Sequence, residues 1–221
     1  MPGVSRFRPL PASFYRRPAD VVARDLLGRY LVRAHAGGRL VLRLVETEAY
    51  LGAADAASHA RGGHRSARNE SMYLEGGHAY VYFVYGMHWC LNVVCARPGV
   101  PHAVLLRAGE AVEGAARMAE LRGLGRAPRP GELAGGPARL CSALGVDRAL
   151  DGADLRRGEL RLTAGEPADP ASIAVSARVG VDYAGDAARW PLRFYVATSG
   201  EVSRTPRARR ASAQPGPRRR R

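Results

Sequence analysis

The sequence predicts a single mixed α+β domain, with a curved, mostly antiparallel sheet, surrounding helices and a protruding β-hairpin. Three observations support this fold class. Several short runs alternate, or are rich in aromatic and β-branched residues, as strands are. A few other segments carry apolar residues at helical spacing. The chain has 221 residues, of which 46% are hydrophobic, and this is enough for one well-buried core.

The N-terminal part predicts a helix and a strand. Residues 1–17 show no pattern of a helix or a strand and are expected to be irregular. We place their first part, residues 1–9, as an irregular lead-in to the domain. A helical pattern then opens at Pro18. The apolar residues that would share one face of this helix are Val21, Val22, Leu26 and Leu27. Residues 39–50 alternate, which predicts a strand with a polar end.

A β-hairpin is expected after a loop over residues 52–71. Residues 79–85 and 88–96 are two aromatic and β-branched runs, and a small turn at Gly86 and Met87 separates them. One face of such a hairpin packs into the core, which leaves the other face free to line a pocket.

Shorter elements are predicted for the second half of the chain. The run HAVLLRA, residues 102–108, predicts a strand, and we expect this strand to end at Arg107. Helical spacing follows, at Val112, Ala115, Ala116 and Ala119. A mobile loop rich in Gly, Pro and Arg is expected over residues 123–137, followed by a helix over 138–144 and a final strand from Pro191.

The chain is strongly basic, and arginine supplies all of its strong cations. The 34 Lys+Arg residues are all arginine and stand against 20 Asp+Glu, which gives a formal net charge of +14. This charge predicts attraction to a polyanion, with nucleic acid first and an anionic membrane second. Codon bias in a GC-rich genome is an equally good reason for the missing lysine. Residues 204–221 hold eight arginines, no acid and no apolar run, which predicts a disordered basic tail after a domain of residues 1–203.

Cysteine usage and hydropathy indicate a soluble protein of a reducing compartment. Three cysteines do not suggest a disulfide framework. No stretch approaches the roughly 18 apolar residues of a membrane span, and no secretory signal is visible. We therefore expect an intracellular protein with no membrane partner.

No metal or cofactor is expected. Cys90 and Cys95 are five residues apart, so they face opposite ways on a regular strand, and no CxxC or HExxH motif occurs. A P-loop and a dinucleotide fingerprint are absent as well. Any chemistry must come from side chains and water.

Glu46 and Glu48 are the candidates for acid–base chemistry. They lie two residues apart on a predicted strand, so both carboxylates point to one face, with Cα atoms about 6.6 to 6.8 Å apart. Tyr50 follows on that face. Such a pair suits an acid/base site, but in a basic protein an ion pair with nearby arginines is the more frequent outcome. The spacing does not choose between the two.

The loop before the hairpin carries cations and flexible backbone. His59 and His64 lie among Arg61, Arg65 and Arg68, and two glycines allow a ligand to approach the backbone closely. Contact with phosphate and a merely solvated surface loop are both compatible with this pattern.

Aromatic residues concentrate in the hairpin. On a strand, Tyr80 and Tyr82 share one face, while Phe83 and Tyr85 share the other. A base that has left its stack presents a π-face, and stacking on an aromatic ring is worth roughly 1 to 3 kcal/mol per base. A hairpin that is simply packed remains the alternative.

Several segments match a known family in order and spacing. They are VETEAYLG, SHARGG, ARNESMY, HAYVYFVYGMHWCLNVV and AVLLRA. With them the chain resembles the alkyladenine (3-methyladenine) DNA glycosylases of the methylpurine type. The likeness extends from about Leu10 through GGPARLC to PLRFYV, and ETEAY followed by YVYFxYGM is its most specific part.

The resemblance implies a monofunctional enzyme that cleaves the N-glycosidic bond of alkylated purines in duplex DNA by base flipping and attack of water. In the family the second glutamate of ETEAY positions and deprotonates this water, a role that falls on Glu48. Such an enzyme is expected to need no cofactor and to act as a monomer. Its expected partner is double-stranded DNA that contains damaged purines. A cytoplasmic, nucleoid-associated protein of a bacterium is the expected setting.

Other site residues follow from the same matching. Tyr50, His59 and Tyr82 are expected around the extruded base, and Asn92 is expected to crowd the exocyclic amino group of guanine. Tyr85 would intercalate and fill the vacated space in the DNA. The remaining two positions concern DNA contacts: Arg107 lies where the family contacts DNA close to the flipped nucleotide, and His64 stands where relatives often carry arginine.

Two other functions compete with the glycosylase. A non-catalytic protein would recognise distorted DNA with the aromatic wedge and the basic surface, and a carbohydrate hydrolase would use Glu46 and Glu48 as its two carboxyls. The glycosylase hypothesis requires Glu48 to face the surface that carries Tyr50, Tyr82 and Tyr85. It also requires that an ion pair does not close off the carboxylate.

Overall fold

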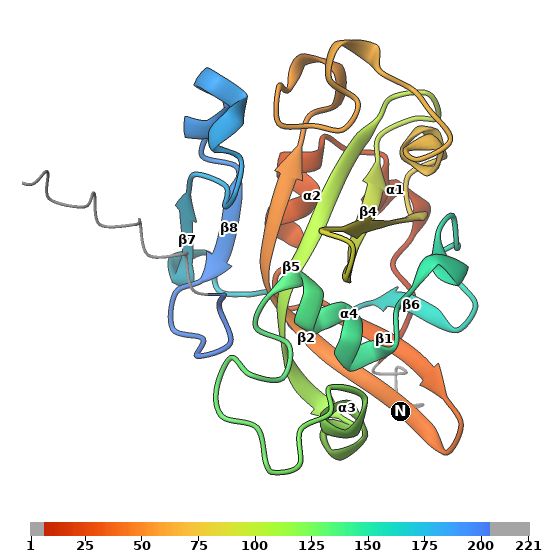
Figure 1. Cartoon of the computed structure of the whole chain (residues 1–221), viewed down its shortest axis with the longest axis vertical. Coiled ribbons are helices and arrows are strands. Elements are labelled where there is room, and N and C mark those ends of the chain that lie inside the picture. Colours follow the sequence, from red (N-terminus) through yellow and green to blue (C-terminus); the bar gives the residue numbers. More distant parts are fainter. Residues whose placement is uncertain (1–6, 204–221) are drawn as a thin grey trace, which may run out of the picture.

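The computed structural model describes residues 7–203, and the predicted basic tail lies outside the described residues. One antiparallel sheet forms the centre of the fold, and helices lie against it (Figure 1). The expected α+β fold class, with its curved antiparallel sheet, is therefore confirmed. The domain boundary at residue 203 stays a prediction.

The sheet is built around its two longest strands. Along the sheet the strands are hydrogen-bonded in the order β3-β4-β5-β2-β1-β6, β8 pairs with β2, and β7 pairs with β8. Their bounds are β1 Tyr30–His35, β2 Gly38–Tyr50, β3 Ala79–Val84, β4 His88–Cys95, β5 His102–Glu113, β6 Leu160–Thr163, β7 Ile173–Ser176 and β8 Arg193–Val196. Because β2 pairs with β1 over its first half and with β8 near its end, it connects the two parts of the sheet.

The end of β2 is bent where it carries its acids. Its pairing with β5 shifts register between Leu44 and Glu46 and again between Glu46 and Thr47. Bulges of this kind re-aim side chains and are frequent beside active sites. Thr47 points to the other face of the sheet, where its hydroxyl donates to the carbonyl of Ala23 at 2.8 Å. Glu46 and Glu48 consequently share the face opposite this helix.

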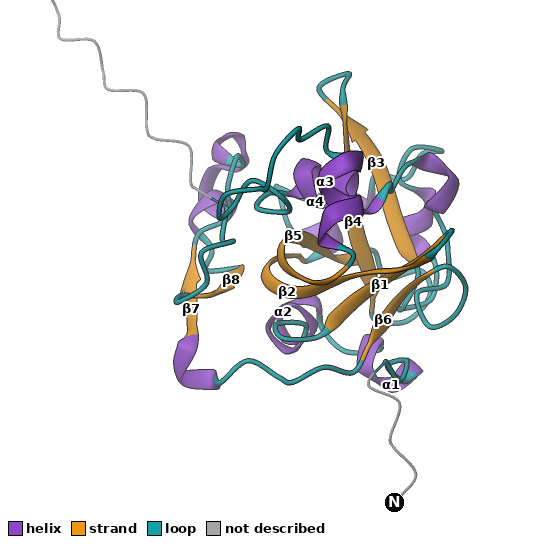
Figure 2. Cartoon of the chain, turned by 90° about the horizontal axis from the view of Figure 1, so that it is seen from below, coloured by secondary structure: helices purple, strands orange, loops and turns teal. Residues whose placement is uncertain are grey.

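Helices cover the sheet from two sides. They are α1 Ala12–Tyr15, α2 Ala19–Asp25, α3 Ala115–Leu121 and α4 Pro137–Leu144. The helix α2 packs on β2 and β5, α4 packs on β4 and β5, and Figure 2 shows these two helices on opposite sides of the sheet. Helix α4 begins with Pro137, which is favoured in the first turn of a helix. It ends just before Gly145, whose left-handed backbone conformation is typical of a residue that terminates a helix.

Short 3-10 helices occupy the connections. They are η1 Gly52–Ala54, η2 Arg61–Gly63, η3 Glu70–Tyr73, η4 Arg148–Leu150, η5 Pro170–Ser172 and η6 Asp182–Arg189. The first three shape the loop between β2 and the hairpin, and η6 precedes β8. No helix in residues 7–203 is both long and apolar enough to cross a membrane.

Most elements predicted from the sequence are present. The hairpin, the helix after Pro18, the helix over 138–144 and the final strand are confirmed as β3–β4, α2, α4 and β8. The expected end of a strand at Arg107 is wrong, because β5 runs on to Glu113 and pairs there with Val41 of β2. Val112 therefore belongs to a strand, and helix α3 begins at Ala115.

Two further expectations differ from the structure. Residues 1–17 are not irregular throughout, since they contain the helix α1, whose Tyr15 is fully buried. Val21 does not share the buried face of α2, since it is 40% exposed. The strands β1, β6 and β7 were not predicted, because their four to six residues carry too short a pattern to stand out. All three cysteines are buried and free.

Candidate active site

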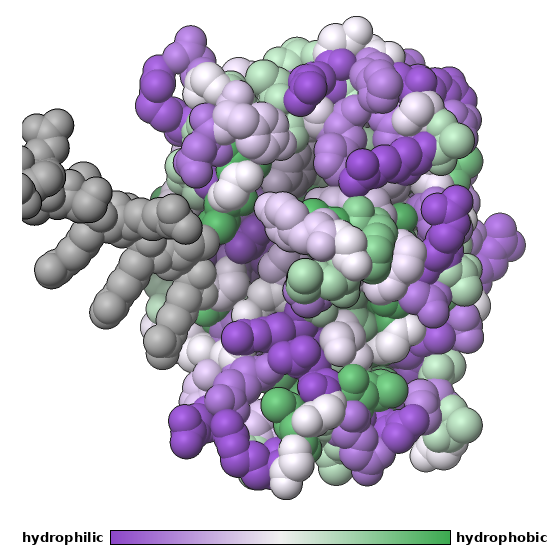
Figure 3. Space-filling view, in the orientation of Figure 1, coloured by the Kyte–Doolittle hydropathy of each residue, from purple (hydrophilic) through white to green (hydrophobic). Residues whose placement is uncertain are grey.

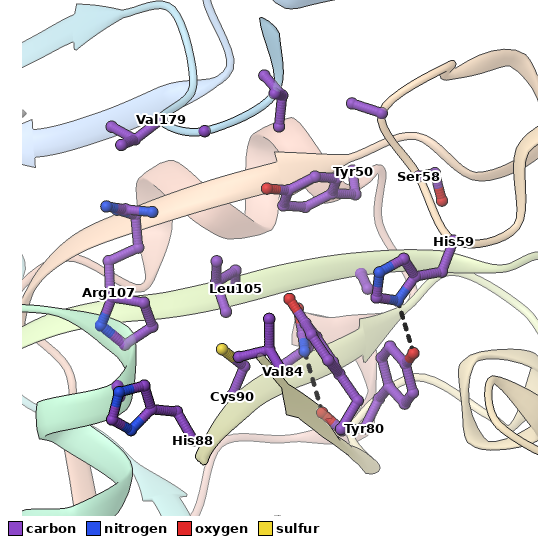
Figure 4. Close-up of a pocket in the computed structure, with 18 of the residues that line it drawn as sticks. Tyr50, Ser58, His59, Tyr80, Val84, His88, Cys90, Leu105, Arg107 and Val179 are labelled. Carbon is purple, nitrogen blue, oxygen red and sulfur yellow. Dashed lines mark hydrogen bonds between the residues drawn. The ribbon is translucent and has the colours of Figure 1, made fainter. Parts of the chain in front are cut away.

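A cavity of about 270 Å³ lies between the hairpin and the ends of β2 and β5. The loop after β2 and the segment that leads into η6 complete its walls, and Figure 4 shows the side chains that surround it. Six of the seven site residues predicted from the sequence line this cavity: Tyr50, His59, Tyr82, Tyr85, Asn92 and Arg107. The seventh, Glu48, lies directly behind its wall.

Glu48 is fully buried and held by three donors. Its Oε1 accepts the backbone N–H of Val179 at 2.7 Å. Its Oε2 accepts the hydroxyl of Tyr50 at 3.0 Å and lies 3.2 Å from Nη1 of Arg107. All three donors line the cavity, so the carboxylate is separated from it only by the groups that hold it.

One condition of the sequence hypothesis is met and the other is not. Glu48 faces the side of the sheet that carries Tyr50 and Tyr82. It is not open, however, because its side chain is fully buried and paired with Arg107. A carboxylate at such a depth needs donors to keep its charge, since the interior solvates ions poorly. The donors Tyr50, Val179 and Arg107 therefore lie between Glu48 and the cavity.

Arg107 connects both glutamates. Its Nε donates to Glu46 at 2.7 Å, its Nη1 faces Glu48, and its Nη2 donates to the hydroxyl of Ser203 at 3.0 Å. Its side chain is 7% exposed, although it lines the cavity. The structure thus places Arg107 inside the cavity, beside the carboxylates, rather than on the outer surface.

Glu46 is enclosed by cations and N–H donors. Oε1 accepts Nε of Arg107 and Nε of Arg193, the latter at 2.8 Å, and also the hydroxyl of Ser203. Oε2 accepts the N–H of Ser203 at 2.6 Å. Burial would raise the pKa of Glu46, but the two arginines and the Ser203 N–H outweigh it and hold that pKa below its ordinary value. Of the two alternatives that the sequence left open for the pair of acids, the ion pair with nearby arginines is the one found at Glu46.

Tyr50 forms one wall of the cavity. Burial, and next the neighbouring Glu48 carboxylate, raise the pKa of Tyr50 well above its ordinary value. The phenol therefore stays protonated and remains a donor to Glu48. The ring itself presents an electron-rich face to the cavity, as binding of a flat cation requires.

The opposite wall is an aromatic cluster. The rings of Tyr80 and Tyr82 are stacked, with centroids 5.3 Å apart, and His59 stands edge-on to Tyr82 at 4.6 Å. The imidazole Nδ1 of His59 is hydrogen-bonded to the hydroxyl of Tyr80 at 2.8 Å (Figure 4). Burial, followed by the charges of Arg68 and Arg61, lowers the pKa of His59, so the ring is neutral at neutral pH.

Asn92 lies on the strand β4 at the base of the cavity. It is 4% exposed, and its Nδ2 donates to the carbonyl of Tyr80 at 3.0 Å. This bond fixes the orientation of the amide. A bound base would therefore meet a rigid polar group at this position.

Tyr85 stands at the tip of the hairpin. It is 83% exposed, and its φ of 54° lies in the left-handed region, next to Gly86 at 69°. A positive φ at both central residues is what a tight hairpin turn requires, and a bulky residue rarely adopts it. Backbone strain of this kind is frequent at functional sites.

The basic loop forms a second cavity, of about 300 Å³, which shares His59, Arg68 and Tyr80 with the first. His64 lies on its lining, and Arg65 is paired with Glu70 instead. The phosphate contact predicted for this loop stays a prediction. Hydrophilic side chains are spread widely over the face of the molecule in Figure 3.

Sequence reasoning missed two residues that line the cavity, Val179 and Tyr183, and also Arg178, whose guanidinium lies behind the lining, over the Tyr50 ring. Val179 contributes a backbone N–H, and no side-chain pattern signals such a role. Tyr183 is 64% exposed on the rim of the cavity. Within residues 7–203, no group of three or more His, Cys, Asp and Glu could hold a metal ion.

These features together define a cavity with aromatic walls next to a buried carboxylate. The family model for methylpurine-DNA glycosylase (MPG) matches residues 13–200. A candidate 3-methyladenine DNA glycosylase of Methanocella arvoryzae is 50% identical over 195 residues, which cover 88% of this chain and 96% of that protein. The DNA-3-methyladenine glycosylase of Mus musculus is 42% identical over 216 residues, 93% of this chain and 64% of the mouse protein. The chain belongs to the methylpurine-DNA glycosylase family.

Proposed function

We propose that this protein is a DNA repair enzyme, a monofunctional DNA-3-methyladenine glycosylase that excises alkylated purines from duplex DNA. Family membership supports a glycosylase that hydrolyses N-glycosyl bonds. The single observation that carries the proposal is the aromatic cavity with Glu48 directly behind its wall. We also propose that the enzyme acts as a monomer, in the bacterial cytoplasm near the nucleoid.

The cavity is suited to a base that has left the helix. A base inside a duplex cannot be attacked at its sugar carbon, so the nucleotide must swing out, at an unstacking cost of a few kcal/mol. Tyr85, which is exposed at the hairpin tip, would enter the gap, as inserted side chains do in other proteins that kink DNA. The extruded base would then stack between Tyr50 and Tyr82.

The walls favour a cationic purine. Alkylation at N3 or N7 gives the purine a positive charge, which stacks well on electron-rich rings. His59 adds no competing charge because it is neutral. A cationic purine is also a good leaving group, so little protonation by the protein is required. The fixed amide of Asn92 would crowd the exocyclic amino group of an undamaged guanine.

Hydrolysis would use Glu48 and its neighbours. As the bond breaks, positive charge develops on the sugar, and an ionised Glu48 stabilises this charge and takes the proton of the attacking water. General-base action of this kind contributes roughly 10² to 10⁴ in rate. Arg107, whose Nη1 lies 3.2 Å from Oε2 of Glu48, would hold the carboxylate in place.

The competing functions have less support. A carbohydrate hydrolase needs two available carboxyls, but Glu46 is fully buried and bound to Arg107, Arg193 and Ser203. A non-catalytic DNA-binding protein would have no use for a carboxylate buried behind its base cavity, which costs solvation energy.

Release of the base tests the proposal directly. The protein is incubated with alkylated duplex DNA, and free 3-methyladenine is measured by chromatography. We expect release of the base with an abasic site left in an uncut strand. Binding to the alkylated duplex without any released base would refute the enzyme and support the DNA-binding alternative.

A further inference from the structure

A fully buried ion pair lies beside the cavity without lining it. Arg178 and Asp55 have no exposed side-chain surface, and both guanidinium ends are bonded to the carboxylate, Nη1 at 2.5 Å and Nη2 at 2.8 Å. Removing two charges from water is costly, so such a pair contributes little net stability in general. Its role is better judged from the groups that it positions.

The pair joins two regions that are distant in sequence, residues 49–55 and residues 178–187. Arg178 precedes η6, Asp55 lies in the loop after β2, and the guanidinium also donates to the carbonyls of Ala49 and Ala187 at 3.0 and 3.1 Å. Asp55 in turn accepts the N–H of Leu51. These bonds fix the distance between the end of β2 and the segment that contains Arg178.

One consequence concerns the Tyr50 wall. The guanidinium carbon of Arg178 lies 4.7 Å from the centroid of the Tyr50 ring. Tyr50 lines the cavity and Arg178 does not, so the guanidinium supports the ring from behind. A bare cation at this position would oppose a cationic base on the other face of the ring. The bidentate contact with Asp55 offsets that charge.

The other consequence concerns Glu48. The residue after Arg178 is Val179, whose N–H donates to Oε1 of Glu48 at 2.7 Å. A backbone N–H can orient a carboxylate only if the backbone itself is held. The four hydrogen bonds of Arg178 hold it, one residue away.

We propose that Arg178 is a positioning residue for the excision reaction. It acts through two neighbours, the Tyr50 ring and the Val179 N–H, and so sets the geometry of base and general base together. Asp55 keeps the guanidinium in place and neutralises it. This inference rests on the proposed function and adds a residue to the same site.

The variant Arg178→Lys tests the inference. Lysine keeps the positive charge and can reach Asp55, but it cannot bridge Asp55, Ala49 and Ala187 at once or stack flat on Tyr50. We expect the single-turnover rate constant for release of 3-methyladenine from duplex DNA to fall roughly 10- to 100-fold, because small misplacements of reacting groups slow a reaction by about this much. The reaction amplitude and the affinity for DNA stay within about twofold of wild type.

Amplitude and rate constant separate positioning from folding. A variant that merely misfolds loses amplitude, because fewer molecules are active, and the survivors react at the wild-type rate. Asp55→Asn is the second variant and should slow the reaction in the same direction by a smaller factor. The matched control is Arg156→Lys, since Arg156 makes a similar bidentate contact with Asp154 at 2.7 and 3.0 Å and does not line the cavity.

Two outcomes would overturn the inference. In the first, both Arg178→Lys and Asp55→Asn react with the wild-type rate constant, and in the second, both lose only reaction amplitude. An equal slowing by Arg156→Lys would overturn it as well. A wild-type protein that releases no base would instead remove the proposed function, and the inference with it.

Discussion

The two glutamates of β2 differ in their surroundings although they share a strand face. Glu46 accepts from Arg107, Arg193 and the Ser203 N–H and hydroxyl, so its charge is fully matched by cations and donors. Glu48 shares only Arg107 with it, and its other donors are the neutral hydroxyl of Tyr50 and a backbone N–H.

We propose that this difference separates a structural glutamate, Glu46, from a catalytic one, Glu48. A carboxylate between two arginines is stabilised as an anion and has little tendency to take a proton. The carboxylate of Glu48, with one arginine and two neutral donors that line the cavity, is the better placed to act on a water molecule. Identical residues two positions apart thus have different electrostatic surroundings.

The largest effect is expected for Glu48→Gln. The amide keeps the size of the side chain but cannot accept a proton, so we expect excision of 3-methyladenine to fall by about 10² to 10⁴. Affinity for duplex DNA that contains a modified purine should be retained. Single-turnover base release and a binding titration measure the two quantities. Full activity in this variant would refute the assignment of Glu48 as the general base.

Glu46→Gln should act on stability instead. Loss of one partner from a buried ion-pair network costs about 3 to 5 kcal/mol, since Arg107 and Arg193 remain without their shared anion. The pKa of Glu46 is lowered in the folded protein, so its contribution is present above the unfolded value of about 4.3 and is lost as pH falls through the folded pKa. The wild type should therefore lose its advantage over the variant in acid.

Urea unfolding of both proteins at pH 7, 5 and 3.5 measures this effect. We expect the difference in the free energy of unfolding to be greatest at neutral pH and to narrow below about pH 4. A difference that is independent of pH would show that the charge of Glu46 is not what stabilises the protein.

A smaller effect is expected at the hairpin tip, outside both carboxylate networks. Tyr85→Ala removes the wedge and should slow excision from duplex DNA by about tenfold, which corresponds to roughly 1.4 kcal/mol of lost stacking. Tyr85→Phe keeps the ring and should be close to wild type. On a single-stranded substrate no helix must be opened, so a Tyr85→Ala defect of equal size there would contradict the wedge.

Local patterns in the sequence predicted much of the fold. Turn residues and hydrophobic periodicity within about ten residues predict the hairpin, α2 and α4. The length of β5 was not predictable in the same way, because residues 109–113 are strand only through pairing with residues 41–44 in the first half of β2. The short strands β6 and β7 likewise depend on the partners that they find.

The candidate site was predicted in composition but not in arrangement. The sequence shows the motif that contains Glu48 and Tyr50, and it shows the aromatic residues of the hairpin. The alternation of β2 places both glutamates on one face. The burial of Glu48 was not expected, since it results from donors that approach from other strands and loops.

By itself the sequence determined the family motifs, the aromatic hairpin and the common face of the two acids, because each depends on neighbours along the chain. Only the tertiary structure decided which acid lies behind the cavity. Val179 is 131 residues from Glu48, and Arg178 is 123 residues from Asp55. Hydrogen bonds across such separations exist only after the sheet has closed, so no local pattern can encode their geometry.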